Sequence, residues 1–212
     1  MGAGVNLTAA RAEMMQWRAH TYPVVIDQRL DIKGLATLTE TEADEADESG
    51  QLAGNHMYQD LRGCCRDDLS RALDLERQFM ARLQDAEDLE DEAARLDEER
   101  LDCFEPSDGL WELDIGVASA TVALSVLGAV PVGSCNAGGF GGQHQGGHPY
   151  VAFYLGTAAP ETIIALARAA DVGLRCDEAG LVQIFATGDF ALFRFAQTVR
   201  DRCGRPGSLT PA

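Results

Sequence analysis

Residues 114–155 read DIGVASATVALSVLGAVPVGSCNAGGFGGQHQGGHPYVAFYL, and this stretch decides the fold. No Asp, Glu, Lys or Arg occurs from Ile115 to Pro160, which is typical of a segment that lies inside a folded domain. Its apolar first part approaches the minimum length of a membrane span, about 17 residues. Small and polar residues dilute that apolarity, however, and no Lys or Arg borders the segment. We therefore expect a buried helix followed by a strand, and no membrane partner.

The sequence after the turn cluster at 106–109 alternates between helix and strand patterns. The predicted elements are a buried helix over 115–127, a strand over 129–135, a glycine-rich loop over 136–147, a strand over 150–155, a helix that begins at Pro160, a hairpin of strands 174–176 and 181–186, and a last helix capped by Asp189. Helices on one face of a small mixed or antiparallel sheet satisfy this order. We expect a compact two-layer α/β sandwich over residues 109–204 and a tail over 205–212.

Residues 56–105 are expected to form a long acidic helical segment, so that the fold class is α+β. Apolar residues recur at steps of three and four between residues 57 and 103, which predicts one amphipathic helix or two helices broken near Gly63. A single apolar stripe cannot bury itself, so it must pack on a partner helix, on the C-terminal domain or on a second copy of the chain. The candidate interaction residues of this helix are Leu75, Phe79, Leu83, Leu89 and Leu96.

Residues 1–55 are expected to form a poorly ordered leader. A short helix is predicted over residues 7–20. The run over 39–50 is rich in acidic residues and poor in apolar ones, and like charges repel, so it is interpreted as a mobile acidic loop.

The chain carries 17 basic and 34 acidic residues, which gives a net charge of −17. Residues 56–108 hold 17 acidic and 7 basic residues, whereas residues 109–212 hold 8 and 6, so the C-terminal domain is almost neutral. This balance disfavours nucleic acid as a partner, although an acidic mimic of nucleic acid remains an alternative. The first eight residues show no signal-peptide pattern, and the six cysteines show no CxxC or disulfide spacing. We therefore expect a cytoplasmic protein.

The glycine-rich segment from Gly133 to Pro149 is the stretch most able to carry chemistry. A hairpin needs only about 2–5 connecting residues, and the segment is longer than that. It also holds two of the four histidines. The candidate ligand-binding residues are Ser134, Cys135, Asn136, Gly138, Gly139, Gln143 and His144.

Four interpretations of this segment remain open. Cys135, His144 and His148 have side chains suited to zinc, although their spacing matches no established signature. Cys135 is also a candidate catalytic nucleophile, with His144 as its base. The glycine backbone amides are able to form an anion-binding nest. The last interpretation is a flexible connector whose polar side chains have no role in binding.

The unit over residues 114–153 consists of a buried helix, a short strand, Ser134-Cys135-x-x-Gly138 and a strand that starts after a proline. It resembles a local pattern of uncharacterised bacterial proteins. It is also similar to the Ser-Cys-Ser-Gly-Arg segment of a tRNA wybutosine-synthesising methyltransferase family. Ser134 and Cys135 match the first two positions of that segment, but the rest departs from it and the arginine is absent. The resemblance implies a ligand site at the sheet edge near Cys135, for S-adenosylmethionine or RNA.

The sequence as a whole favours a cytoplasmic protein-interaction or ligand-recognition module. In this hypothesis the acidic helix binds another copy of the chain or a different protein, and the glycine-rich loop contacts a ligand. The alternative is a small metal-dependent or thiol enzyme centred on Cys135, His144 and His148. A second alternative is the acidic nucleic-acid mimic.

Overall fold

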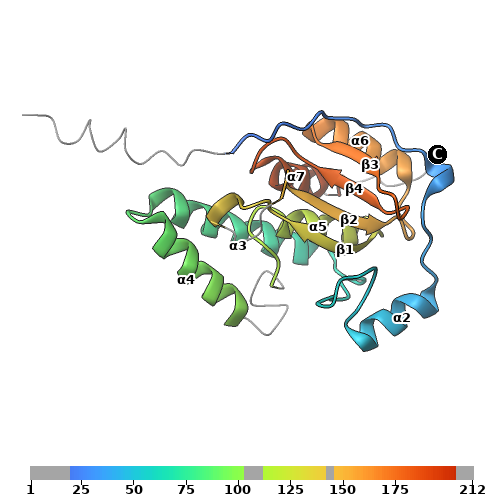
Figure 1. Cartoon of the computed structure of the whole chain (residues 1–212), viewed down its shortest axis with the longest axis horizontal. Helices are drawn as coiled ribbons and strands as arrows, with labels where there is room; N and C mark the ends of the chain where they lie inside the picture. Colours follow the sequence, from blue (N-terminus) through green and yellow to red (C-terminus); the bar gives the residue numbers. More distant parts are fainter. Residues whose placement is uncertain (1–19, 103–111, 142–145, 204–212) are drawn as a thin grey trace, which may run out of the picture.

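A computed structural model describes residues 20–102, 112–141 and 146–203, and its sheet has four antiparallel strands in the order β1-β2-β4-β3 (Figure 1). The strands are β1 (Val130–Cys135), β2 (Tyr150–Tyr154), β3 (Gly173–Cys176) and β4 (Val182–Phe185). β2 and β4 lie in the centre, which explains the near-continuous apolar run of β2. The hairpin predicted around residues 177–180 is confirmed as the β3–β4 connection.

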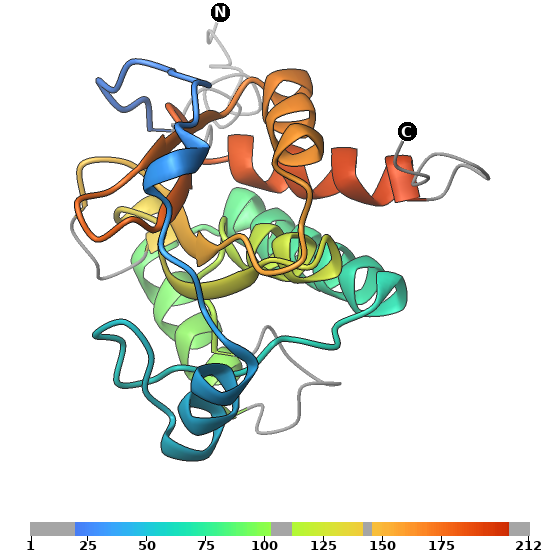
Figure 2. The ribbon, with the colours of Figure 1, turned by 90° about the vertical axis from the view of Figure 1, so that its right-hand side faces the viewer.

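Four helices cover one face of the sheet and share one buried apolar core with it. They are α3 (Arg66–Asp85), α5 (Ala118–Val126), α6 (Pro160–Ala170) and α7 (Ala191–Cys203). Figure 2 shows α6 and α7, in orange and red, to the right of the sheet. The predicted α+β class with helices on one face of an antiparallel sheet is therefore confirmed. No helix in the described parts of the chain is long and apolar enough to cross a membrane.

The predicted long acidic helix is two helices, α3 and α4 (Leu89–Asp102), and the break lies at residues 86–88 rather than near Gly63. Ala86 has an extended backbone and ends α3. The Asp88 carboxylate accepts hydrogen bonds from the N–H groups of Glu90 and Asp91, at 3.0 and 3.1 Å, and starts α4. Arg82 of α3 binds two carboxylates of α4, so the two helices form a closed hairpin.

The assignment of the apolar stripe to a protein-interaction surface is wrong for most of its residues. The stripe of α3 packs on α5 and α7 inside the same domain. Phe79, Leu83 and Leu96 are 4%, 3% and 0% exposed, and Leu75 is half-buried. Of the five, only Leu89 is exposed, at 39%. Three partners were possible for the stripe: another helix, the C-terminal domain or a second copy of the chain. The structure shows the C-terminal domain, because α3 covers apolar surface of α5 and α7.

The prediction of a mobile loop over residues 39–50 is also wrong. These residues form α2 (Glu40–Ser49), which begins with a capping box between Thr39 and Glu42. The Thr39 hydroxyl accepts from the Glu42 N–H, and the Glu42 carboxylate accepts from the Thr39 N–H. These two bonds satisfy two backbone N–H groups at the start of the helix. The helix therefore forms even though its acidic side chains repel one another. Ala43 and Ala46 give the helix a small buried face.

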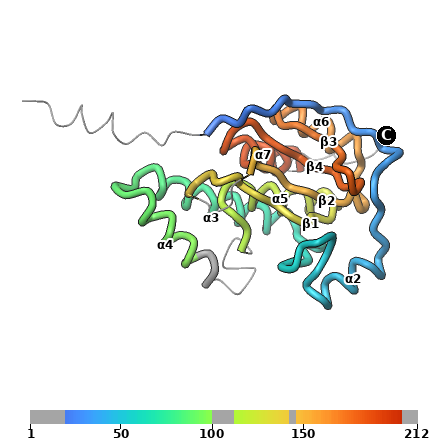
Figure 3. Tube along the Cα trace, viewed as in Figure 1, coloured from blue at the N-terminus to red at the C-terminus, as the bar shows by residue number. Residues whose placement is uncertain are grey.

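The segment over residues 20–36 lies along the domain rather than forming a loose leader (Figure 1, Figure 3). The Leu174 N–H donates to the Asp27 carbonyl at 2.6 Å, and the Gln28 side chain donates to the Val172 carbonyl at 2.9 Å. These bonds occupy the outer edge of β3. The segment over residues 20–36 also contains a short 3-10 turn, η1 (Ile32–Gly34). The short helix predicted over 7–20 and the tail over 205–212 lie outside the described residues, except for His20.

The start of the buried helix α5 is capped by Glu76 of α3. The side chain of Glu76 is fully buried. Its carboxylate accepts hydrogen bonds from the N–H groups of Gly116, Ala118 and Ser119 and from the Ser119 hydroxyl. Burial raises the pKa of Glu76 to about 7, against the effect of these hydrogen bonds. An ionisable residue of the acidic segment is thus part of the core of the domain.

Candidate functional site

The described part of the glycine-rich loop has a defined shape that Asn136 maintains. The side chain of Asn136 is buried, and its amide group donates to the carbonyls of Ile115 and Gly139 at 3.1 and 2.9 Å. Its side-chain oxygen accepts from the Gly138 N–H at 3.2 Å. Asn136 is a predicted ligand-binding residue, but two of these bonds use its polar atoms within the loop and the third joins the loop to Ile115. Residues 136–141 are therefore a folded loop and not a flexible connector.

The buried Asp189 and the half-buried Tyr22 support this loop from outside, and the Tyr22 hydroxyl lies 3.4 Å from the Ala137 carbonyl oxygen. The Asp189 carboxylate accepts hydrogen bonds from the His20 N–H at 2.8 Å and from the Tyr22 hydroxyl at 3.0 Å. Burial, followed by the charge of Asp189, raises the pKa of Tyr22 far above its ordinary value, so the hydroxyl remains a donor. The predicted capping role of Asp189 at the last helix is thus replaced by contacts with the N-terminal segment.

The far end of the loop packs on the acidic hairpin. η2 (Gly139–Gly141) contacts α4, and a Cβ atom on Gly141 would overlap the Ala93 side chain. Phe140 is buried with a left-handed backbone (φ 55°), and its ring meets Phe190 edge to face at 5.1 Å. Left-handed geometry is costly for a residue other than glycine, so the packing of the ring must hold it.

Ser134 and Cys135 point to opposite sides of β1. Ser134 pairs with Val151, whose side chain lies in the core under the helices, and Ser134 lines a pocket at that side. Cys135 pairs with Tyr150, which belongs to the face of the sheet opposite the helices, called here the open sheet face. The structure therefore separates two residues that were predicted to act together.

The remaining predicted ligands are only partly covered by the structure. Gln143 and His144 lie outside the described residues, so the zinc site and the Cys135–His144 pair stay predictions. His148 lies over the open sheet face, where its Nε2 atom is 3.0 Å from the Arg175 guanidinium. Burial, and next the charge of Arg175, lower the pKa of His148. Within the described ranges, no three His, Cys, Asp or Glu side chains are grouped as metal ligands.

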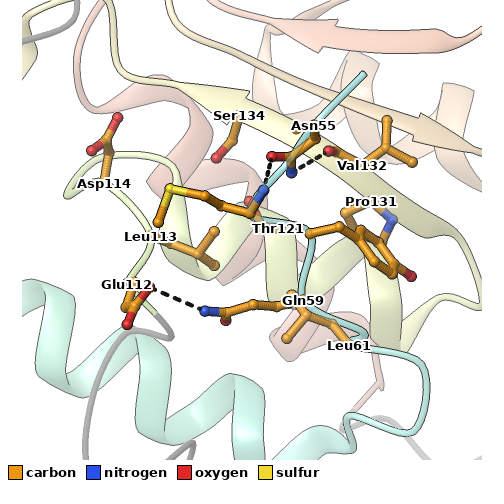
Figure 4. A pocket seen from close by; sticks show the side chains of 13 residues that line it. Asn55, Gln59, Leu61, Glu112, Leu113, Asp114, Thr121, Pro131, Val132 and Ser134 are labelled. Carbon is orange, nitrogen blue, oxygen red and sulfur yellow. Dashed lines mark hydrogen bonds between the residues drawn. The ribbon is translucent and has the colours of Figure 1, made fainter. Parts of the chain in front are cut away.

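The pocket that Ser134 lines is the β1-edge pocket, with a volume of about 300 Å³ (Figure 4). Three segments form it: residues 55–61, residues 112–114 and the free edge of β1 at 131–134, with Thr121 of α5 at its base. The Asn55 side chain donates to the Val132 carbonyl at 2.8 Å and so takes the place of a neighbouring strand. The Gln59 amide donates to the Glu112 carboxylate at 3.4 Å.

The chemistry of the β1-edge pocket is acidic and polar. Glu112 and Asp114 supply carboxylates, and the described lining residues include no Lys, Arg or His. Asn55, Gln59 and Ser134 add amide and hydroxyl groups on the other walls (Figure 4). Such a lining favours a ligand that carries positive charge and hydrogen-bond donors.

A second cluster of polar side chains lies on the open sheet face around Arg175. The guanidinium stacks over the Phe185 ring, 4.9 Å from the ring centre, and donates to the Gln183 side-chain oxygen from Nε and Nη2 at 3.0 and 2.9 Å. Phe185 in turn lies across Gly173 of the next strand, where a Cβ atom would overlap its ring. Gly173 therefore makes the space that the Phe185–Arg175 stack needs.

Gly173→Ala is expected to lower the free energy of unfolding by about 2 kcal/mol, because the added methyl group must displace the Phe185 ring. The measurement is urea unfolding followed by circular dichroism. Gly133→Ala is the matched control, since a Cβ atom there meets no atom within 4 Å. Equal losses in the two variants would contradict the packing argument.

Sequence reasoning missed Arg175, Gln183 and the β1-edge pocket. The predicted hairpin contained a signal for the first two, because residues 175 and 183 are direct cross-strand partners in it. The pocket had no such signal, since segments separated by more than 50 residues form it.

Comparison of the chain with models of protein families, with curated proteins and with solved structures gives no match. The resemblance to the wybutosine-synthesising family stays a prediction.

Proposed function

We propose that the protein is a ligand-recognition module that binds a small organic cation, such as an alkylammonium group, in the β1-edge pocket. The observation that carries the proposal is the lining of this pocket, in which the carboxylates of Glu112 and Asp114 accompany neutral hydrogen-bonding groups. The proposal retains the prediction that Ser134 contacts the ligand. It does not need the acidic helices as an interaction surface.

The size and position of the pocket support this function. Its volume of about 300 Å³ lies at the lower end of the range for small-molecule sites, about 300–1,000 Å³. Alkyl groups of a ligand would contact Met57, which is 71% exposed, and Leu113. The net charge of −17 attracts cations toward the surface and raises their rate of association.

The cysteines support the cytoplasm as the compartment in which this binding takes place. Cys64, Cys65, Cys135, Cys176 and Cys203 are free thiols in the structure. Free thiols suit a reducing compartment, where disulfides rarely persist.

Titration with 1,4-diaminobutane and with butylamine tests the proposal, with 1-butanol as the uncharged control. Both amines are expected to shift the backbone amide signals of Gln59 and Ser134 saturably in NMR spectra, whereas butanol leaves them unchanged. The double variant Glu112→Gln/Asp114→Asn is expected to weaken amine binding at least about tenfold, because it removes both carboxylates.

Glu178→Gln is the matched control, since Glu178 is an exposed acid in the β3–β4 turn and does not line the pocket. It is expected to leave amine binding unchanged. Equal binding of butanol, equal affinity of the double variant, or the absence of a saturable shift would each refute the proposal.

A further inference from the structure

Arg175 has no negatively charged partner in the described chain. Seven other arginines form ion pairs with carboxylates there: Arg29, Arg62, Arg71, Arg77, Arg82, Arg95 and Arg200. Arg175 instead binds the uncharged amide of Gln183 and the ring of His148. Because a guanidinium has no acceptor, His148 accepts through Nε2 and is neutral. A full positive charge therefore remains on the open sheet face of a strongly acidic protein.

The guanidinium is held in place and still has donors to offer. Its Nε–H and one Nη2–H donate to Gln183, and the other Nη2–H donates to His148. One face of the guanidinium packs on the Phe185 ring. Both N–H groups of Nη1 have no acceptor among the described residues, and Arg175 is exposed to solvent. A fixed guanidinium loses little rotamer entropy when it binds, which favours recognition of an oxyanion.

The neighbouring residues on this face add further donors and an apolar surface. Tyr150 lies on β2 next to Phe185 on β4, and Cys135 lies next to Tyr150 on β1. The ring of Tyr150 is half-buried and its hydroxyl stays protonated, since burial raises its pKa. A ligand bound to the guanidinium, which lies over Phe185, would therefore have the Tyr150 ring one strand away.

We propose that the open sheet face binds an oxyanion, the phosphate or carboxylate group of a small molecule, through Nη1 of Arg175, with the ring of Tyr150 beside it. This site is separate from the β1-edge pocket and does not depend on the cation-binding function. No residue of the cluster lines that pocket.

NMR titration of the arginine side-chain signals tests the proposal on the intact protein. Inorganic phosphate and acetate are added in separate series at constant ionic strength. Phosphate or acetate is expected to shift the Arg175 signals saturably with a Kd of about 1 mM, and the anion that binds more tightly identifies the class of group recognised. If neither anion shifts these signals at about 20 mM, well above that Kd, the proposal is overturned.

Three variants separate a site from general charge effects. Arg175→Gln is expected to abolish the saturable shift of the His148 ring and Tyr150 signals, and Arg175→Lys to weaken binding several-fold because it keeps the charge but loses the planar fork. Arg168→Gln is the matched control, since Arg168 is exposed on α6 and has no ion pair with a described residue. Retained binding in Arg175→Gln, or an equal loss in Arg168→Gln, would overturn the proposal. Should Arg175→Gln fail to fold, the wild-type titration and Arg175→Lys decide the question.

Discussion

Glu76→Ala is expected to lower the free energy of unfolding by about 5 kcal/mol, which is comparable to the whole stability of many domains of this size. The substitution leaves three backbone N–H groups and the Ser119 hydroxyl without their acceptor inside the core. Each buried donor left without a partner costs about 1–3 kcal/mol. The carboxylate also lies at the N-terminus of α5, where the helix dipole favours negative charge. Urea unfolding followed by circular dichroism measures the loss.

Glu76→Gln is the matched control for that substitution. The glutamine keeps one side-chain oxygen for the Gly116 and Ala118 N–H groups, but its NH₂ group faces the Ser119 N–H, which is also a donor. We expect a loss of about 2 kcal/mol, since one donor is left without an acceptor. If alanine and glutamine destabilise the protein equally, the capping role assigned to the carboxylate is wrong.

The pKa of Glu76 also predicts how the stabilities of the wild type and of Glu76→Gln differ with pH. A folded-state pKa of about 7 lies above the ordinary value of 4.5, so the folded protein holds the proton more tightly than the unfolded chain. The resulting stabilisation is complete below pH 4.5 and is lost as the pH rises through 7. Wild type is therefore expected to lose about 2 kcal/mol relative to Glu76→Gln between pH 5.5 and pH 8. A difference between the two proteins that does not change with pH would contradict this assignment.

Leu83→Asp is expected to lower the free energy of unfolding by about 4 kcal/mol, whereas Leu89→Asp changes it by less than about 0.5 kcal/mol. Leu83 is 3% exposed and its replacement would place a carboxylate among apolar side chains, while Leu89 is 39% exposed at the start of α4. The two residues lie on adjoining helices of one acidic hairpin and serve as a matched pair. Thermal unfolding measures the stability of each variant.

Sedimentation of the same two variants distinguishes a core residue from an interface residue. Because the stripe lies inside the domain, Leu89→Asp is expected to sediment as wild type does. A change in oligomeric state of Leu89→Asp without a loss of stability would restore the hypothesis that this helix mediates self-association.

The sequence was most informative where one local pattern determines the structure. The uncharged stretch after Asp114 predicted α5, β1 and β2 because a buried helix and a central strand both exclude charge. Thr39 and Glu42 carry the spacing of a capping box, and that signal outweighs the acidity of the run around them. The prediction of a mobile loop over residues 39–50 was wrong because it did not consider this capping box.

The partners of α3 depend on contacts between distant segments and had weaker signals. Glu76 lies between Leu73 and Met80 in the apolar stripe, so a charge at that position indicated a buried polar role. The group that it binds, the start of α5, lies 40 residues further along the chain, and no periodicity within α3 identifies it. The β1-edge pocket is similar, because its walls meet only after the chain has folded.

The two edges of the sheet bear on how this protein behaves at high concentration. At one edge Asp27 and Gln28 lie against Leu174 of β3. At the other edge β1 contains Pro131, an irregular register between Pro131 and Gly133, and a Val132 carbonyl occupied by Asn55. Exposed edges allow chains to join sheet to sheet and aggregate, and prolines, bulges and covering segments oppose this. The chain therefore combines a sheet face that the four core helices do not cover with edges that resist the growth of intermolecular β-structure.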